Sequence, residues 1–365
     1  MAEGTHRRAR AYIGSFTSAG GRGITTAGLD AATGALTPLH HTEGAVADPS
    51  FLALAPAGRT LYAVSESDQG GAAAFSPRHD GPPEPLGGTV SVDAAGPTHL
   101  SVADGRLFTA NYTSGSVTAL PLRADGSLGP APVTRQHHGS GPVADRQEGP
   151  HAHAVVPDPS GQWLLVTDLG TDSVWIYDVR GTPPGLRLHR EVPLRAGTGP
   201  RHLAFASGAS GRTAEPPEGE RVYVVNELDS TVTTCRWHSG TGELEALGES
   251  RVVPSGRTGP DNYPSALVLS PDGRFAWVAN RGDDSIAVLD LTADELPVLT
   301  ATVPCGGHWP RDLAAPPAGG RLYAANERSG DVTWFDVDPE TGMPHRGGSL
   351  PAPAASCVVF DVPLD

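Results

Sequence analysis

The sequence predicts an all-β fold: a seven-bladed β-propeller that forms a single domain. Three observations predict it, namely short apolar runs bounded by turn residues, a repeat of these runs along the chain, and incomplete repeats at the two ends. The chain has 365 residues, including 46 glycines and 35 prolines, and 38% of its residues are hydrophobic. So many turn formers, beside enough apolar residues for a core, are typical of a globular all-β protein.

The repeat is clearest in residues 264–289, where three apolar runs are separated by polar turns. Each run has about five to seven residues rich in Val, Leu and aromatic side chains, as strands do, and no segment shows a helical pattern. A small or polar residue that we expect to cap a turn ends the second run of each copy. These residues are Ser15, Ser65, Asn111, Asp168, Asn226, Asn280 and Asn326. Their mean spacing of about 52 residues fits four strands in each blade.

The two ends of the chain complete one blade in this prediction. The first copy lacks its leading strand, and residues 355–360 form a leading strand with no copy after it. Pairing these two pieces closes the ring and leaves neither sheet edge unpaired. We therefore expect a flexible N-terminus at residues 1–10 and one propeller domain at residues 11–365.

Two stretches interrupt the repeat. The Gly-, Ser-, Pro- and Glu-rich segment Ser207–Glu220 replaces a tight turn between two strands, and we expect a flexible surface insertion there. The segment Thr134–Pro150 lengthens a connection between two blades. Long connections often carry functional residues, so this one is a candidate part of a site.

Charge and composition exclude several classes of function. The formal net charge is −15, which opposes binding to nucleic acids and to anionic membranes. No apolar run approaches the roughly 18 residues of a membrane-spanning helix, and the basic N-terminus is not followed by the apolar stretch of a signal peptide. The chain contains no lysine, so a Schiff-base mechanism is excluded and arginine supplies every permanent side-chain cation.

The three cysteines, Cys235, Cys305 and Cys357, lie far apart and have no metal-ligand spacing. This pattern favours incidental thiols in a reduced compartment, so we expect a cytoplasmic protein without structural disulfides.

The start of a blade's first strand and the end of its second strand lie on one face of the disc, because the two strands are antiparallel neighbours. Residues at these positions must therefore gather around one mouth of the central channel. Those at the start of the first strand are Ser50-Phe51, Thr98-His99, Ala152-His153, Arg201-His202, Ser265-Ala266 and Arg311-Asp312. Those just after the second strand are Phe16, Glu66, Tyr112, Leu169, Glu227, Arg281 and Glu327. The segment Thr134–Pro150 opens on the same mouth.

Ionisable groups around a poorly solvated channel are costly unless they are paired or used, which makes these positions a candidate active site. We predict a catalytic group of four residues: His153, Arg201, Glu227 and Arg281. We predict that a second set binds the substrate: His99, His151, His202, Glu66, Glu327, Arg146 and Arg311. Ion pairing alone is an alternative interpretation of Glu66 and Glu327, and a hydrogen-bonded structural role is an alternative for His99.

Five runs resemble those of the seven-bladed lactonase family, which includes propeller-type 6-phosphogluconolactonases and fungal carboxy-muconate cycloisomerases. They are Arg146–His153, Val166–Asp172, Gly199–Phe205, Val225–Leu228 and Asn280–Ile286. The similarity spans essentially the whole chain. It implies that the His, Arg, Glu and Arg of the cycloisomerase site fall on His153, Arg201, Glu227 and Arg281, with His151 as the alternative histidine. It also implies that no metal or other cofactor is needed.

These residues favour hydrolysis of a small anionic sugar lactone, similar to the reaction of 6-phosphogluconolactonase. Glu227 or neutral His153 would take a proton from water, Arg201 and Arg281 would stabilise the oxyanion, and His153 or His202 would protonate the leaving oxygen. Burial would raise the pKa of Glu227, whereas the arginines would lower it.

Three alternatives stay open at this point. The same residues suit a cycloisomerase that closes a lactone from a muconate-type diacid. A non-catalytic binding module would need an apolar surface patch, of which the sequence gives no clear sign. A calcium site of Glu66, Glu227, Asn111 and Asn226 has suitable oxygen ligands, but the neighbouring arginines oppose a cation. We expect a monomer or a weak homodimer.

Overall fold

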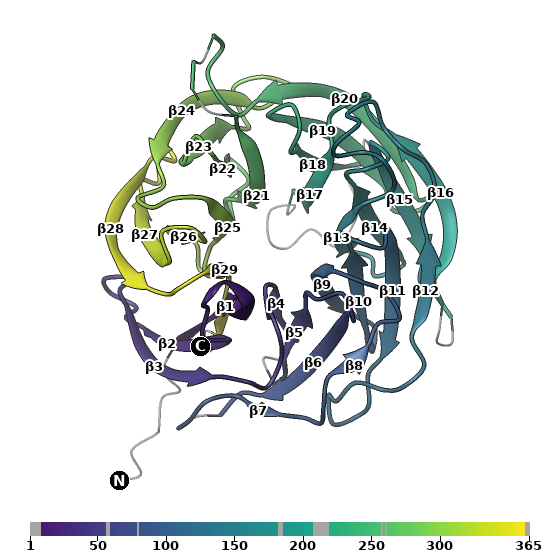
Figure 1. Cartoon of the computed structure of the whole chain (residues 1–365). Coiled ribbons are helices and arrows are strands. Elements are labelled where there is room, and N and C mark those ends of the chain that lie inside the picture. Colours follow the sequence, from purple (N-terminus) through teal and green to yellow (C-terminus); the bar gives the residue numbers. More distant parts are fainter. Residues whose placement is uncertain are drawn as a thin grey trace.

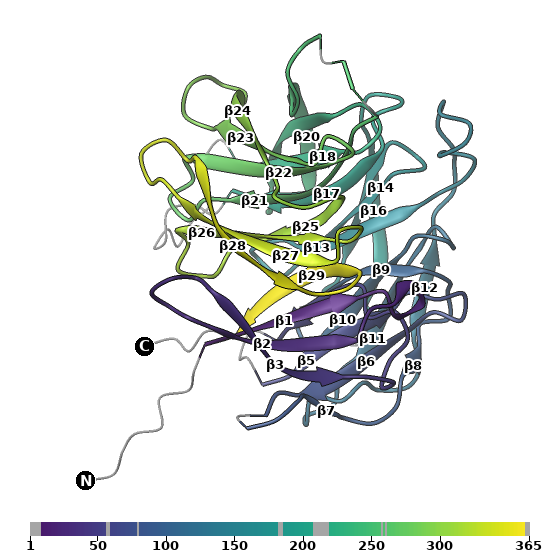
Figure 2. The ribbon, with the colours of Figure 1, turned by 60° about the vertical axis from the view of Figure 1, so that its left-hand side comes forward.

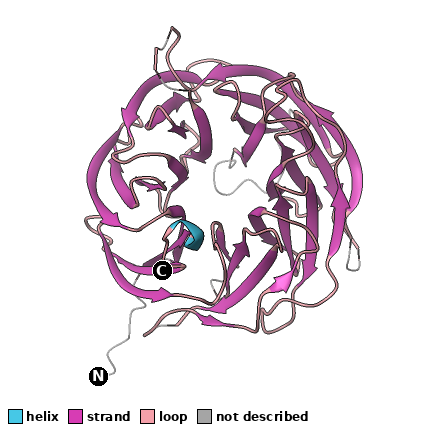
Figure 3. Cartoon of the chain, in the orientation of Figure 1, coloured by secondary structure: helices cyan, strands magenta, loops and turns pink. Residues whose placement is uncertain are grey.

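The computed structural model describes residues 9–55, 59–78, 80–181, 185–206, 219–256, 258–259 and 261–361. Seven antiparallel sheets are arranged in a ring, as the sequence predicted, with the innermost strand of each sheet toward the centre (Figure 1). Strands and loops make up nearly all of the described chain, whose only helix is the short 3-10 helix Thr17–Ala19 (Figure 3). No helix in this part of the chain is long and apolar enough to span a membrane.

The blades are numbered here from the N-terminus, and the strands of each blade run from the channel outward. Blade I contains β29 (Ala355–Asp361), β1 (Arg10–Ser15), β2 (Ile24–Leu29) and β3 (Leu36–Thr42). Blade II contains β4 (Leu52–Leu54), β5 (Leu61–Ser65) and β6 (Gly71–Ser76), with β7 (Glu84–Pro85) and β8 (Val90–Ser91) both paired to β6. Blade III contains β9 (Pro97–Ala103), β10 (Arg106–Asn111), β11 (Ser116–Pro121) and β12 (Val133–Gln136).

The remaining four blades each have four strands. Blade IV contains β13 (Ala152–Pro157), β14 (Trp163–Asp168), β15 (Ser173–Asp178) and β16 (Arg187–Pro193). Blade V contains β17 (Pro200–Phe205), β18 (Glu220–Asn226), β19 (Thr231–His238) and β20 (Glu243–Arg251). Blade VI contains β21 (Tyr263–Leu269), β22 (Phe275–Arg281), β23 (Ser285–Asp290) and β24 (Val298–Pro304). Blade VII contains β25 (Pro310–Ala314), β26 (Arg321–Asn326), β27 (Asp331–Val337) and β28 (Pro344–Pro351).

The two ends of the chain close the ring, which confirms the predicted closure. Strand β29 pairs antiparallel with β1 from Arg10, opposite Asp361, to Ser15, opposite Ala355. The two strands lie side by side in both ribbon views (Figures 1 and 2). Closure within one sheet covers the edge that β1 would otherwise expose.

The hydrophobic core lies between neighbouring blades, because both faces of each sheet are buried. In β14, Leu164 and Val166 pack in a cluster with blade III, whereas Trp163 and Leu165 pack in a cluster with blade V. This alternation follows from the two-residue period of a strand. It explains why the inner strands are almost continuously apolar, as strands buried on both faces are.

The two segments that interrupt the sequence repeat differ in part from the prediction, and some of their residues lie outside the described chain. Residues 134–136 belong to β12, so the long connection between blades III and IV begins at His137. In the segment Ser207–Glu220, residues 207–218 lie outside the described residues. The predicted flexible N-terminus is also outside them as far as residue 8, and β1 begins at Arg10.

Candidate active site in the channel mouth

Bulges at the start of the innermost strands turn side chains toward the channel. In β17, Pro200 pairs with Asn226 and His202 pairs with Val225, which leaves Arg201 without a pairing partner. An extra residue of this kind bends its strand and changes the direction of its side chain. The residues left unpaired in this way in five blades are Thr98, His153, Arg201, Arg311 and Ser356.

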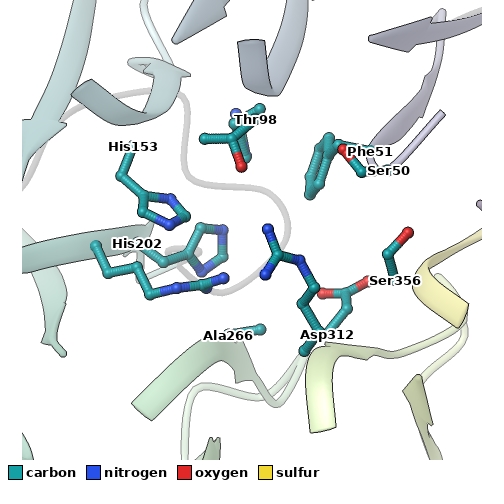
Figure 4. Close-up of a pocket in the computed structure, with 11 residues that line it drawn as sticks. Ser50, Phe51, Thr98, His153, His202, Ala266, Asp312 and Ser356 are labelled. Carbon is teal, nitrogen blue, oxygen red and sulfur yellow. The ribbon is translucent and has the colours of Figure 1, made fainter. Parts of the chain in front are cut away.

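These residues converge on one cavity, which confirms the predicted gathering of the innermost strands around the channel. The cavity has a volume of about 30 Å³, and its lining comes from the start of the innermost strands of all seven blades. It is formed by Ser50, Phe51, Thr98, His99, His153, Arg201, His202, Ala266, Arg311, Asp312 and Ser356. His153, Thr98, Ser50 and Asp312 approach it from different sides (Figure 4).

Glu227, which follows β18, is the centre of a cluster of three arginines. Its Oε1 accepts a hydrogen bond from Nη2 of Arg146 at 2.5 Å, and its Oε2 accepts one from Nη2 of Arg281 at 2.5 Å. The Nε of Arg201 lies 3.1 Å from the same Oε2. Glu227 is only 4% exposed, and Arg201 and Arg281 are each 6% exposed. Three of the four predicted catalytic residues are therefore in direct contact.

The charges in this cluster determine the protonation state of Glu227. Burial raises the pKa of Glu227, but Arg281, Arg201 and Arg146 outweigh it and lower the pKa to about 2. Burial and the charge of Arg281 lower the pKa of Arg201 to about 9. At neutral pH the carboxylate and the guanidinium groups are thus charged, and Glu227 is a weak proton acceptor.

A second cluster surrounds Arg311, which lies in blade VII, next to the blade of Arg281. The Nη2 of Arg311 is 3.5 Å from Oε1 of Glu66, and its Nη1 is 3.6 Å from Oε2 of Glu327. Arg311 also lies over the ring of Phe16, 4.8 Å from the ring centre, and Ser50 donates a hydrogen bond to Glu66. The mouth therefore has one cluster in which three arginines surround a carboxylate and a second in which two carboxylates flank an arginine.

His99 and His202 link blades through the channel wall. The Nδ1 of His99 accepts a hydrogen bond from the backbone N–H of Val155 at 3.3 Å, and Nδ1 of His202 accepts one from Leu267 at 3.2 Å. Burial lowers the pKa of both, with the value for His202 at about 4, so both are neutral near pH 7. The structural role weighed for His99 is present, and both rings still line the cavity.

His153 and His151 have different surroundings. His153 lines the cavity, and burial together with the charges of Arg201, Arg311 and Arg281 keeps its pKa well below the usual value. His151 stacks on the ring of Tyr112 at 4.5 Å, and its Nδ1 lies 3.0 Å from the carbonyl oxygen of Tyr112. His153 is therefore the histidine placed to contact a ligand in the channel.

The connection between blades III and IV brings Arg146 to the site. Its start is fixed by His137, whose Nδ1 lies 2.6 Å from Oδ2 of Asp168 and whose ring stacks on Trp175 at 4.2 Å. Its end is fixed by the buried Gln147, which donates a hydrogen bond to the carbonyl of Leu169 at 2.8 Å. Sequence reasoning did not identify these two anchors, because their partners lie in a different part of the chain.

The column of Asn and Asp residues has a structural role that differs in part from the predicted turn caps. Asp168 accepts backbone N–H groups, including that of His151 at 2.8 Å, as expected of a cap. Asn111 and Asn226 instead donate to hydroxyl groups of the next strand, with Nδ2 of Asn226 at 2.8 Å from Thr231 and from Thr233. Their amide groups thus connect the second and third strands of their own blades.

The oxygen ligands considered for calcium are not arranged for a cation. Oδ1 of Asn111 accepts a hydrogen bond from the Thr109 hydroxyl at 2.9 Å, and three arginines surround Glu227, where they would repel a cation. Within the described ranges, no group of three or more His, Cys, Asp or Glu side chains could hold a metal ion.

The ring of seven blades is a β-propeller. Arginine, glutamate and histidine side chains gather in the mouth of its channel, as they do in the active site of an enzyme. The chain belongs to the family of seven-bladed β-propeller lactonases, whose model matches residues 10–360. This confirms the resemblance seen in the sequence, and the protein is an enzyme of the lactonase type.

Relatives agree with this assignment over nearly their full lengths. The chain is 32% identical to 6-phosphogluconolactonase of Bacillus subtilis over 356 residues, which cover 96% of this chain and 97% of that protein. The structure of the periplasmic gluconolactonase of Pseudomonas aeruginosa is similar, with a TM-score of 0.87, 30% identity, and coverage of 97% of this chain and 99% of that chain. A protein from Lactobacillus plantarum has a TM-score of 0.86 at 29% identity, with coverage of 97% and 100%.

Proposed function

We propose that the protein hydrolyses a small anionic sugar lactone, in the manner of a 6-phosphogluconolactonase. The observation that carries this proposal is that Arg146, Arg201 and Arg281 all contact the buried carboxylate of Glu227. Three guanidinium groups against one carboxylate leave an excess of positive charge for a substrate anion and for the oxyanion of the reaction. Bidentate arginine contacts suit both phosphate and carboxylate groups.

The arginines supply the electrostatic part of the mechanism. As water attacks the lactone carbonyl, negative charge develops on the carbonyl oxygen, and Arg201 and Arg281 are placed to stabilise it. Glu227 holds both guanidinium groups in position before the substrate arrives, so little reorganisation is needed during the reaction. His153 adds a neutral imidazole that can hydrogen bond to the substrate or to water at the channel wall.

The division of the mouth favours a lactone over a muconate-type diacid. In a phosphorylated six-membered sugar lactone, the carbonyl, the ring oxygen and the phosphate-bearing carbon lie along one edge, and three hydroxyl groups lie along the other. The first edge matches the arginine cluster around Glu227, and the hydroxyl groups can donate to Glu66 and Glu327. A diacid would place a second carboxylate against these two glutamates, where like charges repel.

The test is a panel of 6-phosphogluconolactone, unphosphorylated gluconolactone and a carboxylated muconate, with rates corrected for spontaneous hydrolysis. Removal of one donor to a developing oxyanion lowers kcat by about 10²–10³-fold in known cases, and we expect such a loss in Arg201→Ala. Arg236→Ala is the matched control, because Arg236 forms a surface ion pair with Glu245 in the same blade. Lactone hydrolysis that is unchanged in both Arg201→Ala and Glu227→Ala would refute the assignment, and turnover of the muconate alone would replace it with the cycloisomerase reaction.

We also propose a cytoplasmic location and a monomer or weak homodimer. The buried, unpaired thiols of Cys235, Cys305 and Cys357 support a reduced compartment. Cell fractionation and size-exclusion chromatography with light scattering test the two statements.

A further inference from the structure

One acid in the channel has no part in the mechanism described so far. Asp312 lies in β25, directly after the bulge residue Arg311, and its side chain lines the 30 Å³ cavity together with His153 and Arg201. It faces this cavity beside Ser356 (Figure 4).

Asp312 differs from the other carboxylates of the site in its charge partners. Glu227 contacts three arginines, and Glu66 and Glu327 flank Arg311. Oδ2 of Asp312 accepts a hydrogen bond from the backbone N–H of Val358 at 3.0 Å, and within the part of the chain that the structure describes it forms no ion pair with an arginine. It is thus the carboxylate of the channel that no guanidinium neutralises by contact.

The environment of Asp312 sets its basicity. Burial raises its pKa to about 6, although the backbone N–H groups of Val358 and Leu313 and the more distant charges of Arg201 and Arg311 lower it. The other titratable groups around it are the Cys357 thiol on β29 and the cavity-lining His99, His153 and His202, which are neutral near pH 7. Asp312 can therefore exchange a proton near neutrality, whereas Glu227 cannot.

The size and lining of the cavity suit a water molecule. The centres of water-sized molecules can occupy about 30 Å³ of the cavity, which is more than the roughly 10–15 Å³ that one buried water needs, and a buried water needs two to four polar partners. Ser50, Thr98, Ser356 and Asp312 provide such partners. Arg201 also borders the cavity and contacts Glu227, so the cavity adjoins the arginine cluster where the oxyanion would form.

We propose that Asp312 is the general base that takes a proton from the attacking water in this cavity. The proposal rests on the proposed lactone hydrolysis. As the water oxygen bonds to the carbonyl carbon, one O–H bond breaks and its proton moves to the Asp312 carboxylate, while the carbonyl π electrons move to the oxygen near Arg201. The carbonyl then re-forms and the bond from its carbon to the ring oxygen breaks. The ring oxygen takes the proton back from Asp312, which gives the hydroxy acid and regenerates the carboxylate.

The test compares wild type with Asp312→Asn on gluconolactone and 6-phosphogluconolactone between about pH 5 and 7.5. Asparagine keeps an oxygen to accept the N–H of Val358, so the fold is expected to survive, and thermal unfolding checks this. General base catalysis contributes about 10²–10⁴-fold, so we expect kcat to fall at least about 100-fold with little change in KM. The wild-type rate should decrease below about pH 6, and this decrease should be absent in the variant. Asp158→Asn is the control: Asp158 is buried but caps a turn, accepting the N–H of Trp163 at 2.9 Å, and it should retain the wild-type rate and pH profile.

The outcomes separate this proposal from the proposed function. A wild type that hydrolyses neither lactone refutes the function itself. If the wild type is active and the kcat of Asp312→Asn is within about threefold of the wild-type value, the role of Asp312 is overturned and the proposed function stands. The same holds if the rate of the variant still decreases below about pH 6. If the variant does not fold, the pH profile of the wild type still tests the role of Asp312. A rate that is constant between about pH 5 and 7 excludes a general base with a pKa of about 6.

Discussion

Replacing Glu227 by glutamine removes the carboxylate that three arginines share, with almost no change in shape. Arg146 and Arg281 each lose a charged partner at 2.5 Å, and Arg201 loses one at 3.1 Å. Arg201 and Arg281 are buried, so their charges would be left close together with little water to screen them. We expect this substitution to destabilise the fold as well as the site.

The magnitude follows from the lowered pKa of Glu227. Its value of about 2, against 4.5 for an unperturbed glutamate, corresponds to about 3 kcal/mol at 1.36 kcal/mol per pKa unit. Removing one partner of a buried ion pair costs about 3–5 kcal/mol in known cases, which agrees. Because the pKa is lower in the folded state, this stabilisation is complete above pH 4.5 and is lost as the pH falls toward 2.

Urea unfolding, followed by tryptophan fluorescence at pH 7 and at about pH 3, measures this effect. Glu227→Gln should lower the free energy of unfolding by about 3 kcal/mol at pH 7, and the difference from wild type should shrink at pH 3. Glu245→Gln is the matched control, since the ion pair of Glu245 with Arg236 is exposed and such pairs contribute about 0–1 kcal/mol. A loss below about 1 kcal/mol for Glu227→Gln, or a loss that does not depend on pH, would refute the electrostatic account of the cluster.

Three further predictions follow from the fold and its buried groups. Asp312→Asn should raise the free energy of unfolding by about 3 kcal/mol at pH 8 and by little at pH 4. The reason is that the pKa of Asp312 is about 6 in the folded state and 3.8 for an unperturbed aspartate, so the ionised carboxylate destabilises the fold as the pH rises. Urea unfolding at both pH values checks this, and equal effects at both would contradict it. Deleting residues 355–365 removes β29 and exposes β1 as an edge, so we expect aggregation in place of a soluble monomer on size-exclusion chromatography. Burial raises the pKa of all three thiols, to about 12 for Cys235 and Cys305. Cys235, Cys305 and Cys357 should therefore resist a thiol reagent in the native protein and react after unfolding. Rapid labelling of the native protein would contradict their burial.

Much of the fold could be predicted because local patterns in the sequence specify it. Apolar runs with turn residues between them specify strands, and their regular repeat specifies blades. The complementary ends predicted that residues 355–360 would pair with the first strand, and β29 pairs with β1. The positions of Arg201, Glu227 and Arg281 at one mouth followed from the antiparallel order of neighbouring strands, without any knowledge of side-chain contacts.

The contacts within the site could not be predicted in the same way. Arg146 and Glu227 are 81 residues apart, and their hydrogen bond depends on how His137 and Gln147 anchor the connecting segment. The choice between His151 and His153 depends on a bulge that places one ring in the cavity and on a tyrosine that stacks on the other.

The sequence by itself determined that the chain forms a closed seven-bladed ring and which ionisable residues surround one mouth of its channel, because strand periodicity and repeat register are local properties. Only the tertiary structure decided how these groups act on one another. At Glu227 three arginines outweigh burial, whereas at Asp312 burial outweighs more distant arginines. These opposite results arise because electrostatic energy depends on distance through space and on exclusion of water, and neither is encoded in the spacing of residues along the chain.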